Sequence, residues 1–380
     1  MRIGIVCYPT YGGSGAAATE LGRHLARRGH SVHLISGDRP FRAAHLDFTS
    51  NFVLHEIPSV KYPVLRSELY TLSTAVCMAQ LADEENLDIL HSHYAVPHAV
   101  SAVLARHIAR NRRVRLVTTL HGTDITLVGS HPAFAPVVRM GIAESDGVIA
   151  VSAWLRSEMH RRFDLANNCH VIHNFVDPDE YRPLRRPRCS RRTLAAPGEK
   201  IVMHVSNFRP VKRVADVVAA FARVVREVPS VLVMVGDGPD REPAERLARE
   251  LGVYDRVRFV GLQEDVATLL DLADVFLFPS EYESFGLAAL EAMACETPVV
   301  CSASGGLPEV VEDGVSGYLC PMGDVEAMAQ RTIAVLREEG RAQAMGRAAR
   351  QRAVTLFGPD RAIRAHEELY ESLLAQAPHA

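Results

Sequence analysis

Two glutamates, Glu283 and Glu291, flank a stretch whose residue types could bind both hydroxyl groups and phosphates. Glu283 follows an apolar run at 275–278 that is typical of a buried strand, and Glu291 lies inside a helix that we predict to begin near Gly286. Backbone N–H groups at the N-terminus of that helix would attract an anion. Because carboxylates accept hydrogen bonds from hydroxyl groups, the stretch suits a nucleotide sugar. The alternative is a glutamate that caps the helix, followed by a solvated one.

A second stretch, Ser206-Asn-Phe-Arg-Pro-Val-Lys-Arg213, gathers several cations and contains no acid. Arg209 could bind phosphate oxygens with two N–H groups at once, and Lys212 could act as a mobile point charge. The departure of a diphosphate from a sugar develops negative charge, which preorganised cations stabilise. The alternative is a solvated loop. This alternative is disfavoured if the loop lies at the same sheet edge as the two glutamates.

The stretch Gly12-Gly-Ser-Gly15 connects a predicted strand at 2–7 to a predicted helix at 16–28. Glycines at such a junction let the backbone approach a ligand closely, and the helix N-terminus favours negative charge. Read as Gly13-x-Gly15 with Asp38 after the next strand, it also fits the dinucleotide fingerprint. A nicotinamide-dependent oxidoreductase is therefore an alternative, although it leaves both glutamates and the cationic loop without a role.

The elements that must position these residues alternate between strand-like runs and helical stretches, which indicates parallel sheets wrapped by helices. In the first half of the chain, four clusters of polar residues lie at the predicted carboxyl ends of strands. They lie at 91–94, 118–119, 121–124 and 173–174. Because the carboxyl ends of parallel strands meet at one edge of a sheet, we expect a ligand site there.

A chain of 380 residues exceeds the size at which one core stops growing, so we expect an α/β protein with two doubly wound Rossmann-like domains facing a central cleft. The first domain would span 1–176. The stretch 177–198, rich in proline and arginine, would be a linker, and 199–358 would form the second domain. A last helix at about 359–376 could pack back on the first domain.

The composition argues against several classes of partner. The net charge is −3 and runs of one sign are short, so we expect no nucleic acid partner. Seven cysteines, with an odd total and no CxxC, are typical of a reduced cytoplasmic protein. The chain opens without a signal peptide pattern and has no apolar run near the ~20 residues of a membrane span, so we expect no membrane contact. The oligomeric state stays open, with a homo-oligomer as one alternative.

The stretch from Glu283 to Glu291 resembles the paired-glutamate motif of the family 4 retaining glycosyltransferases, which have the GT-B fold. Four further motifs fit that family in the expected order. They are Gly12-Gly-Ser-Gly15, His121-Gly-Thr-Asp124, Gly236-Asp-Gly-Pro239 and Gly305-Gly-Leu-Pro-Glu309. The resemblance implies transfer of a sugar from a nucleotide donor with retention at the anomeric carbon, without a cofactor or an obligatory metal.

Three finer features, at 91–98, 118–125 and 206–213, resemble the subgroup of this family that joins N-acetylglucosamine from UDP-N-acetylglucosamine to L-malate, the first step of bacillithiol biosynthesis. The implied partners are these two small molecules. A family member with another small acceptor, such as inositol phosphate, is an alternative. A UDP-sugar epimerase and a non-catalytic protein that binds sugar nucleotides are two more.

The resemblance also implies residue roles. Glu291 would hold the ribose hydroxyls and Glu283 the sugar hydroxyls, while His121 would lie beside the transferred sugar. Many family members have a Gly-Arg pair where this chain has Ser206-Asn207, so the phosphate cation would be displaced to Arg209. The implied donor-binding residues are Gly15, Asn207, Arg209, Lys212, Gly236, Glu283, Phe285, Gly286, Leu287 and Glu291. The implied catalytic group is His121, Glu283, Arg209 and Lys212, with no metal ligand.

The acceptor side rests on the chemistry of malate, a small dianion with a nucleophilic hydroxyl group. Its pocket needs hydroxyl donors and cations. The expected acceptor-binding residues are Gly13, Ser14, Lys61, Tyr94, Thr118, Thr119 and Asn174.

Overall fold

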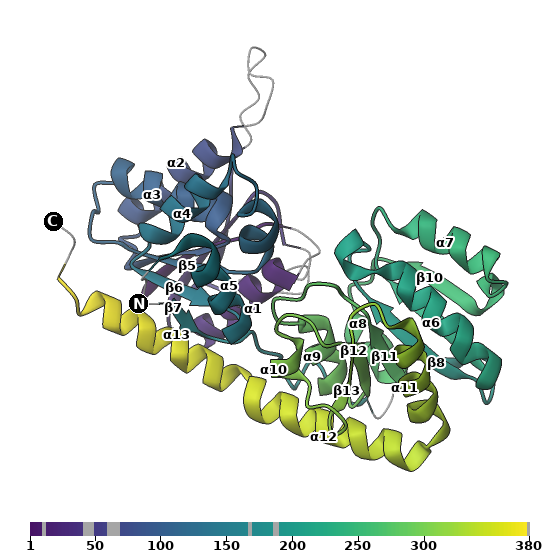
Figure 1. Ribbon diagram of the computed structural model, residues 1–380. Helices are drawn as coiled ribbons and strands as arrows, with labels where there is room; N and C mark the ends of the chain where they lie inside the picture. Colours follow the sequence, from purple (N-terminus) through teal and green to yellow (C-terminus); the bar gives the residue numbers. More distant parts are fainter. Residues whose placement is uncertain (10–12, 41–48, 59–68, 166–168, 185–189, 378–380) are drawn as a thin grey trace. The chain divides into compact units, whose positions relative to one another are not determined.

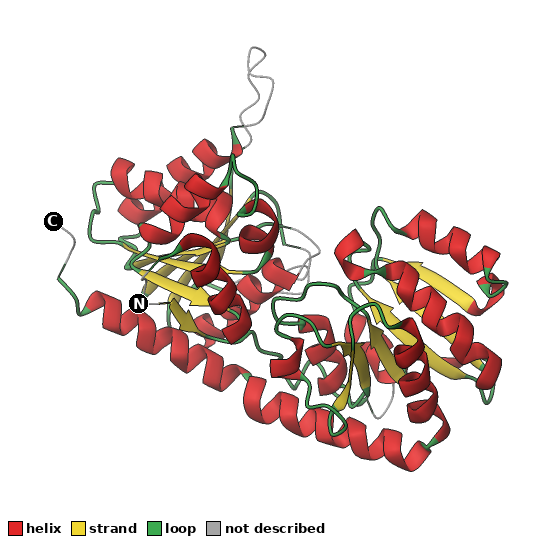
Figure 2. Ribbon diagram, viewed as in Figure 1, coloured by secondary structure: helices red, strands yellow, loops and turns green. Residues whose placement is uncertain are grey.

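The computed structural model describes residues 1–9, 13–40, 49–58, 69–165, 169–184 and 190–377. Its internal contacts divide the chain into two compact units, Met1–Asn174 with Asp360–Ala380, and Phe175–Pro359. Each unit has a parallel sheet with helices packed against it (Figures 1 and 2). The predicted pair of α/β domains is thereby confirmed.

In its described residues the first unit forms a seven-stranded parallel sheet in the order β3-β2-β1-β4-β5-β6-β7. The strands are β1 (Arg2–Val6), β2 (Ser31–Ser36), β3 (Phe52–Glu56), β4 (Ile89–His93), β5 (Arg115–Leu120), β6 (Gly147–Ala150) and β7 (Cys169–Val171). The helices are α1 (Gly13–Arg27), α2 (Tyr70–Glu84), α3 (Val100–Ile108), α4 (Ala135–Ala143), α5 (Ala153–Phe163) and α13 (Pro359–Leu374), with short turns η2 (Ala95–Ala99) and η3 (Asp124–Val128).

The two faces of this sheet receive different helices, and strand β4 shows why. Side chains alternate along a strand, so Leu90 and His91 point to opposite faces. Leu90 packs in an apolar cluster with α2 and α3, whereas the His91 ring is hydrogen-bonded to the Tyr370 hydroxyl of α13. Figure 1 shows α2 and α3 on one side of the sheet and α13 on the other. The last helix is therefore part of the first unit.

The second unit has a parallel sheet in the order β10-β9-β8-β11-β12-β13. Its strands are β8 (Lys200–Val205), β9 (Ser230–Val235), β10 (Val257–Gly261), β11 (Val275–Phe278), β12 (Val299–Ser302) and β13 (Gly317–Cys320). Its helices are α6 (Val214–Glu227), α7 (Arg241–Glu250), α8 (Val266–Leu272), α9 (Leu287–Ala294), α10 (Leu307–Val310), α11 (Val325–Arg337) and α12 (Glu339–Phe357), with short turns η4 (Arg191–Thr193), η5 (Pro210–Lys212) and η6 (Tyr254–Arg256). Helices α6 and α11 share one apolar core with the sheet.

Two boundaries differ from the sequence-based expectation. Helix α1 begins at Gly13 and not at 16, so Ser14 and Gly15 lie in its first turn. The stretch 177–198, expected as a linker, clusters with the second unit. There the Arg191 guanidinium donates hydrogen bonds to the Leu272 and Glu199 carbonyls and forms an ion pair with Asp274. Such contacts join residues far apart in the chain, so local composition does not reveal them.

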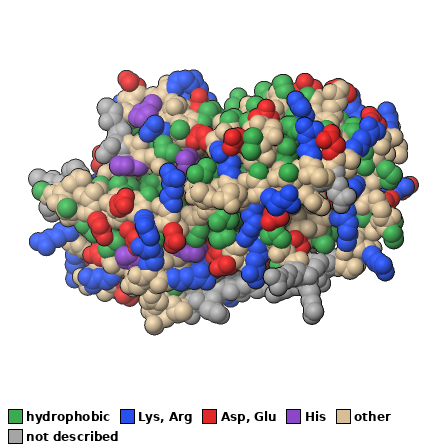
Figure 3. All heavy atoms as spheres, turned by 90° about the horizontal axis from the view of Figure 1, so that it is seen from below, with side chains coloured by type: hydrophobic (Ala, Val, Ile, Leu, Met, Phe, Trp, Pro, Cys, Tyr) green, Lys and Arg blue, Asp and Glu red, His purple; other side chains and the backbone are tan. Residues whose placement is uncertain are grey.

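The described residues include no helix that is both long and apolar enough to cross a membrane. On the face drawn in Figure 3, basic and acidic side chains are interspersed.

Candidate active site

The cationic loop and the first glutamate meet in the second unit. Strands β8 and β11 are neighbours at the point where the strand order reverses, and ligands bind beyond the carboxyl ends of strands at such a switch point. Lys212 follows β8 and Glu283 follows β11, and the Lys212 ammonium pairs with the Glu283 carboxylate. The Glu281 N–H also donates to the Val211 carbonyl at 2.8 Å. The two sequence motifs therefore form one structural feature.

The two cations of this loop have different surroundings. Lys212 is half-buried, and its ammonium lies 5.4 Å from the centre of the Phe278 ring. Arg209 is exposed, and its guanidinium has no ion pair within the described part of the chain. Phe208, directly before Arg209, is fully buried with a φ of 35°, which fixes the turn of the loop. Lys212 is thus held in place, whereas Arg209 is available to a ligand.

Both glutamates are almost completely buried, with 8% of Glu283 and 2% of Glu291 exposed. Helix α9 carries Glu291, and Gly286 precedes it with a φ of 98° that a side chain would rarely tolerate. The first N–H groups of α9, from Leu287 onward, have no partner inside the helix and can serve as donors beside the buried carboxylates. The side chain of Phe285 packs edge-on against Phe357 in the core.

Glycines on two neighbouring loops support these segments through backbone contacts. A Cβ atom on Gly305 would lie 1.9 Å from the Glu283 carbonyl oxygen, and one on Gly306 would lie 2.4 Å from that of Ser284. The Gly306 N–H donates to the Glu283 carbonyl at 2.8 Å. This glycine pair opens the motif Gly305-Gly-Leu-Pro-Glu309. Close backbone approach is the role that the geometry supports.

Gly236 was expected to bind the donor, and the structure places it directly against the cationic loop. A Cβ atom on Gly236 would lie 1.8 Å from the Ser206 carbonyl oxygen, and one on Gly238 would lie 2.3 Å from that of Asn207. The side-chain oxygen of Asn207 is buried and has no partner within the described residues. Gly236 and Gly238 therefore shape the loop by contact with its backbone.

The first unit gathers buried histidines at the carboxyl ends of β4 and β5. His91 and His93 are two residues apart on β4 and so share a face of the sheet. Nδ1 of His93 lies 2.8 Å from Nε2 of His121, which follows β5. Nδ1 of His98 lies 2.6 Å from the His93 carbonyl oxygen. Burial lowers the pKa of His98 to about 4 and that of His121 to about 3, so these imidazoles are neutral at pH 7.

Asp124, the last residue of the motif His121-Gly-Thr-Asp124, ties the two loops of this edge together. Its carboxylate accepts hydrogen bonds from the N–H groups of Ala95, Gly122 and His121, at 3.0, 2.8 and 3.2 Å. Burial raises its pKa to about 6, and these hydrogen bonds hold the increase back. Its oxygens are thus used to position backbone, a role that the sequence analysis did not identify.

The structure brings some of the expected acceptor-binding residues to one edge and separates others. Ser14 follows β1, Tyr94 follows β4 and Thr119 is the penultimate residue of β5, and these strands are consecutive in the sheet. The Tyr94 N–H donates to the Thr119 carbonyl at 2.9 Å. Gly13 and Gly15 flank Ser14 in the first turn of α1.

Thr118 and Asn174 are not part of that group. Thr118 points to the opposite face from Thr119, because neighbours on a strand alternate, and its hydroxyl lies 2.8 Å from that of Ser145. Asn174 follows β7, at the far edge of the sheet from β1. Lys61 lies outside the described residues. The alternation along β5 is a sequence signal that could have separated the two threonines.

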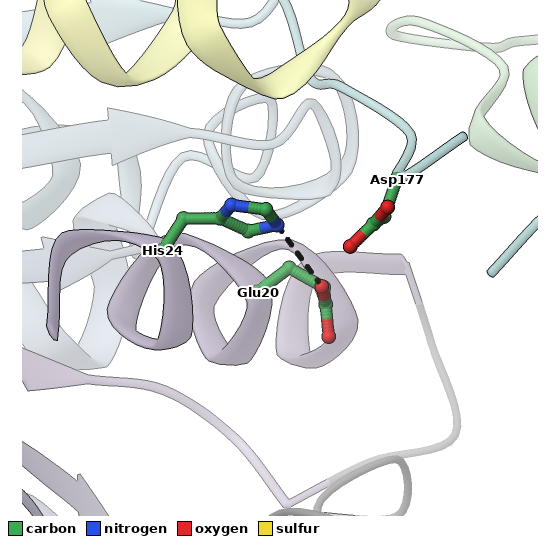
Figure 4. A group of neighbouring side chains, drawn as sticks. All are labelled: Glu20, His24 and Asp177. Atoms are coloured by element: carbon green, nitrogen blue, oxygen red, sulfur yellow. Dashed lines mark ion pairs between the residues drawn. The ribbon is translucent and has the colours of Figure 1, made fainter. Parts of the chain in front are cut away.

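Glu20 and His24 lie one turn apart on α1, and Oε2 and Nε2 are 3.8 Å apart (Figure 4). The third residue drawn there, Asp177, belongs to the other unit. Within either unit taken alone, the described residues bring no three His, Cys, Asp or Glu side chains close enough for a metal ion. The expectation of a reaction without a metal stays a prediction.

Comparison with known proteins agrees with this architecture. Residues 11–180 match the model of glycosyltransferase family 4, and residues 186–352 match that of glycosyl transferases group 1. The chain is 43% identical to N-acetyl-alpha-D-glucosaminyl L-malate synthase of Bacillus anthracis, over 98% of this chain and 97% of that protein. It is 33% identical to D-inositol 3-phosphate glycosyltransferase of Mycobacterium marinum, over 90% of this chain and 78% of that protein.

Solved structures share the fold at lower identity. The sucrose-phosphate synthase of Thermosynechococcus elongatus aligns with a TM-score of 0.82 at 24% identity, over 99% of this chain and all of that one. HepE of Anabaena, in complex with UDP and glucose, aligns with a TM-score of 0.84 at 19% identity, over 98% of this chain and all of that one. The fold is thus that of the GT-B glycosyltransferases, and the chain belongs to glycosyltransferase family 4.

Proposed function

We propose that this enzyme transfers N-acetylglucosamine from UDP-N-acetylglucosamine to the hydroxyl group of L-malate, with retention at the anomeric carbon. The observation that carries this proposal is the 43% identity, over 98% of the chain, to a protein named N-acetyl-alpha-D-glucosaminyl L-malate synthase. Identity to the inositol phosphate enzyme is 33% over 90% of the chain. The malate acceptor is therefore favoured over inositol phosphate.

In this proposal the second unit binds the donor. Arg209 and Lys212 contact the diphosphate, because a departing diphosphate needs fixed positive charge nearby. Lys212 is paired with Glu283, so the carboxylate holds the ammonium beyond the end of β8 until the phosphate competes for it. Glu283 and the N–H groups that open α9 would then contact the sugar, and Glu291 the ribose.

The first unit then binds the acceptor. The hydroxyl groups of Ser14, Tyr94 and Thr119 would hold the carboxylates of L-malate, and His121 would lie beside the sugar. Because burial lowers the pKa of His121 to about 3, its imidazole acts as a neutral hydrogen-bonding group and not as a cationic acid.

Retention requires the incoming hydroxyl to attack from the face that the diphosphate leaves. A covalent route would need a carboxylate nucleophile on the face of the sugar opposite the diphosphate. Asp124 is a poor candidate, because its oxygens accept three backbone hydrogen bonds. We therefore infer that an oxygen of the leaving diphosphate takes the proton of the attacking hydroxyl. The protein contributes positioning and fixed charge, with no cofactor and no obligatory metal.

The test is UDP release with UDP-N-acetylglucosamine and each of four acceptors, followed alongside the mass of the product. L-malate should give UDP and an N-acetylglucosaminyl malate. D-malate should fail because its hydroxyl is misplaced, and succinate because it has no hydroxyl. Faster turnover of inositol phosphate than of L-malate would show that the proposed acceptor is wrong. The assignment as a glycosyltransferase would then still hold. A change of the donor sugar without any acceptor would instead favour an epimerase.

A further inference from the structure

A buried chain of three side chains connects the last helix to the expected acceptor edge. The Tyr370 hydroxyl, on α13, lies 2.7 Å from Nδ1 of His91, and Nε2 of His91 lies 2.7 Å from the Thr119 hydroxyl. Tyr370 and His91 are fully buried, and only 4% of Thr119 is exposed. Both contacts of the His91 ring are therefore at hydrogen-bonding distance.

The two ionisable side chains of this hydrogen-bonded series, His91 and Tyr370, are both neutral. Burial, reinforced by His366 and His121, lowers the pKa of His91 well below 6.5. Burial also raises the pKa of the Tyr370 hydroxyl. The imidazole therefore has one N–H group and one bare nitrogen, and the phenol keeps its proton.

Two orders of the protons are conceivable, and burial distinguishes them. If His91 donates from Nδ1 to Tyr370, the O–H group of Tyr370 has no acceptor within the described residues, in a fully buried place. If Tyr370 donates to Nδ1, His91 donates from Nε2 to Thr119, and the Thr119 proton points elsewhere. An unsatisfied buried donor is costly. The Thr119 hydroxyl, near the carboxyl end of its strand, can instead donate to a ligand bound at that edge of the sheet. The second order is the favoured one.

We infer that Tyr370 and His91 are positioning residues, which fix the Thr119 hydroxyl as a hydrogen-bond donor toward the acceptor. A donor fixed in this way selects a ligand atom that only accepts, such as a carboxylate oxygen. The inference rests on the proposed function for the identity of that ligand. The proton order itself is a property of the protein without substrate.

The kinetic test compares two substitutions of the same imidazole. His91→Gln places an amide N–H near the position of Nε2, whereas His91→Asn reaches only the position of Nδ1. We expect His91→Asn to raise the KM for L-malate about tenfold, the effect of one lost hydrogen bond, while the KM for UDP-N-acetylglucosamine changes less than about twofold. His91→Gln should restore most of the affinity for L-malate. Equal losses in both variants, or parallel changes in both KM values, would overturn the inference.

The matched control is Ser101→Ala, which removes another buried hydroxyl, one that donates to the Thr71 carbonyl at 2.9 Å. It should leave both KM values unchanged. If the His91 variants do not fold, the ¹⁵N chemical shifts of the His91 ring in the unmodified protein decide. Protonated Nε2 supports the inference and protonated Nδ1 overturns it. If L-malate is not a substrate at all, the proposed function fails while the ring shifts still report the proton order.

Discussion

The two units of this enzyme share an architecture but arrange different chemistry at the carboxyl ends of their strands. In the second unit, the loops after β8 and β11 carry a lysine paired with a glutamate. In the first unit, the carboxyl ends of β4 and β5 carry buried neutral imidazoles and hydroxyl groups. The sequence has 17 histidines, and within Phe175–Pro359 it has His204 alone.

The difference follows from what each side is proposed to bind. A diphosphate that leaves with more charge than it arrived with needs formal positive charge. An acceptor that binds beside it can be oriented by neutral donors, and these can be buried completely if each has a partner. Buried neutral imidazoles make folding sensitive to acid, because protonation would place an uncompensated charge in the interior. We therefore expect acid to destabilise the first unit before the second.

The largest expected effect is a loss of stability in acid that begins in the first unit. Five of the histidines buried there have folded-state pKa values well below the ordinary 6.5. They are His91, His93, His98, His121 and His366. Below about pH 6.5 the unfolded chain takes up protons that the folded unit excludes, so stability falls as the pH is lowered. Each unit of pKa difference is worth about 1.4 kcal/mol at full linkage.

Asp124 acts in the opposite sense. Its folded-state pKa is raised to about 6, so between pH 6 and the ordinary 3.8 the folded unit binds the extra proton and gains stability. One carboxyl does not outweigh five imidazoles. Hydrogen exchange at pH 7 and near pH 4.5 should show the first unit losing protection while the second unit keeps it. Earlier loss in the second unit would contradict the comparison.

The second prediction concerns the charged side. Lys212→Ala should lower kcat by about 10²–10³, because a transition-state charge partner is lost. The matched control is Lys200→Ala, since Lys200 begins the same strand β8 and pairs with Asp274 at 3.6 Å. That variant should keep its kcat. Titration with UDP should show weaker binding for Lys212→Ala alone, and identical curves for both variants would remove Lys212 from the phosphate site.

The third prediction tests whether Gly305 supports the Glu283 loop. Gly305→Ala should destabilise the second unit by about 3 kcal/mol and lower turnover, because its Cβ atom would lie 1.9 Å from the Glu283 carbonyl oxygen. Gly314→Ala is the control, since Gly314 also has a positive φ, of 74°, but no atom within 4 Å of the added carbon. It should cost about 1–2 kcal/mol, from backbone strain alone, and keep full turnover. Chemical denaturation and initial rates measure both.

The smallest expected effect is that of Glu291→Gln, which replaces a charge-assisted hydrogen bond to the donor by a neutral one. Affinity for UDP-N-acetylglucosamine should fall by roughly 1–3 kcal/mol while the fold is kept. Glu283→Gln should reduce turnover more, because Glu283 also holds Lys212. Unchanged donor kinetics in both variants would mean that the donor site lies elsewhere.

Much of the fold could be predicted from the sequence, because alternating strand and helix patterns are local signals. The meeting of Lys212 and Glu283 also followed from one rule, since both residues come after strands of one parallel sheet. The contact of His91 with Tyr370 could not be predicted, because it joins residues 279 positions apart. The separation of Thr118 from Thr119 is predictable from the alternation of side chains along β5, although both threonines were expected at the acceptor site.

The division of donor and acceptor between the two units is tested most directly by hydrogen exchange on three samples: the free protein, the protein with UDP, and the protein with UDP and L-malate. UDP should protect the amides of 206–213 and 283–291. L-malate should add protection at 13–15, 94–98 and 119–125, at the carboxyl ends of β1, β4 and β5. If UDP protects none of 206–213 and 283–291, or if L-malate adds protection only there, the account is contradicted.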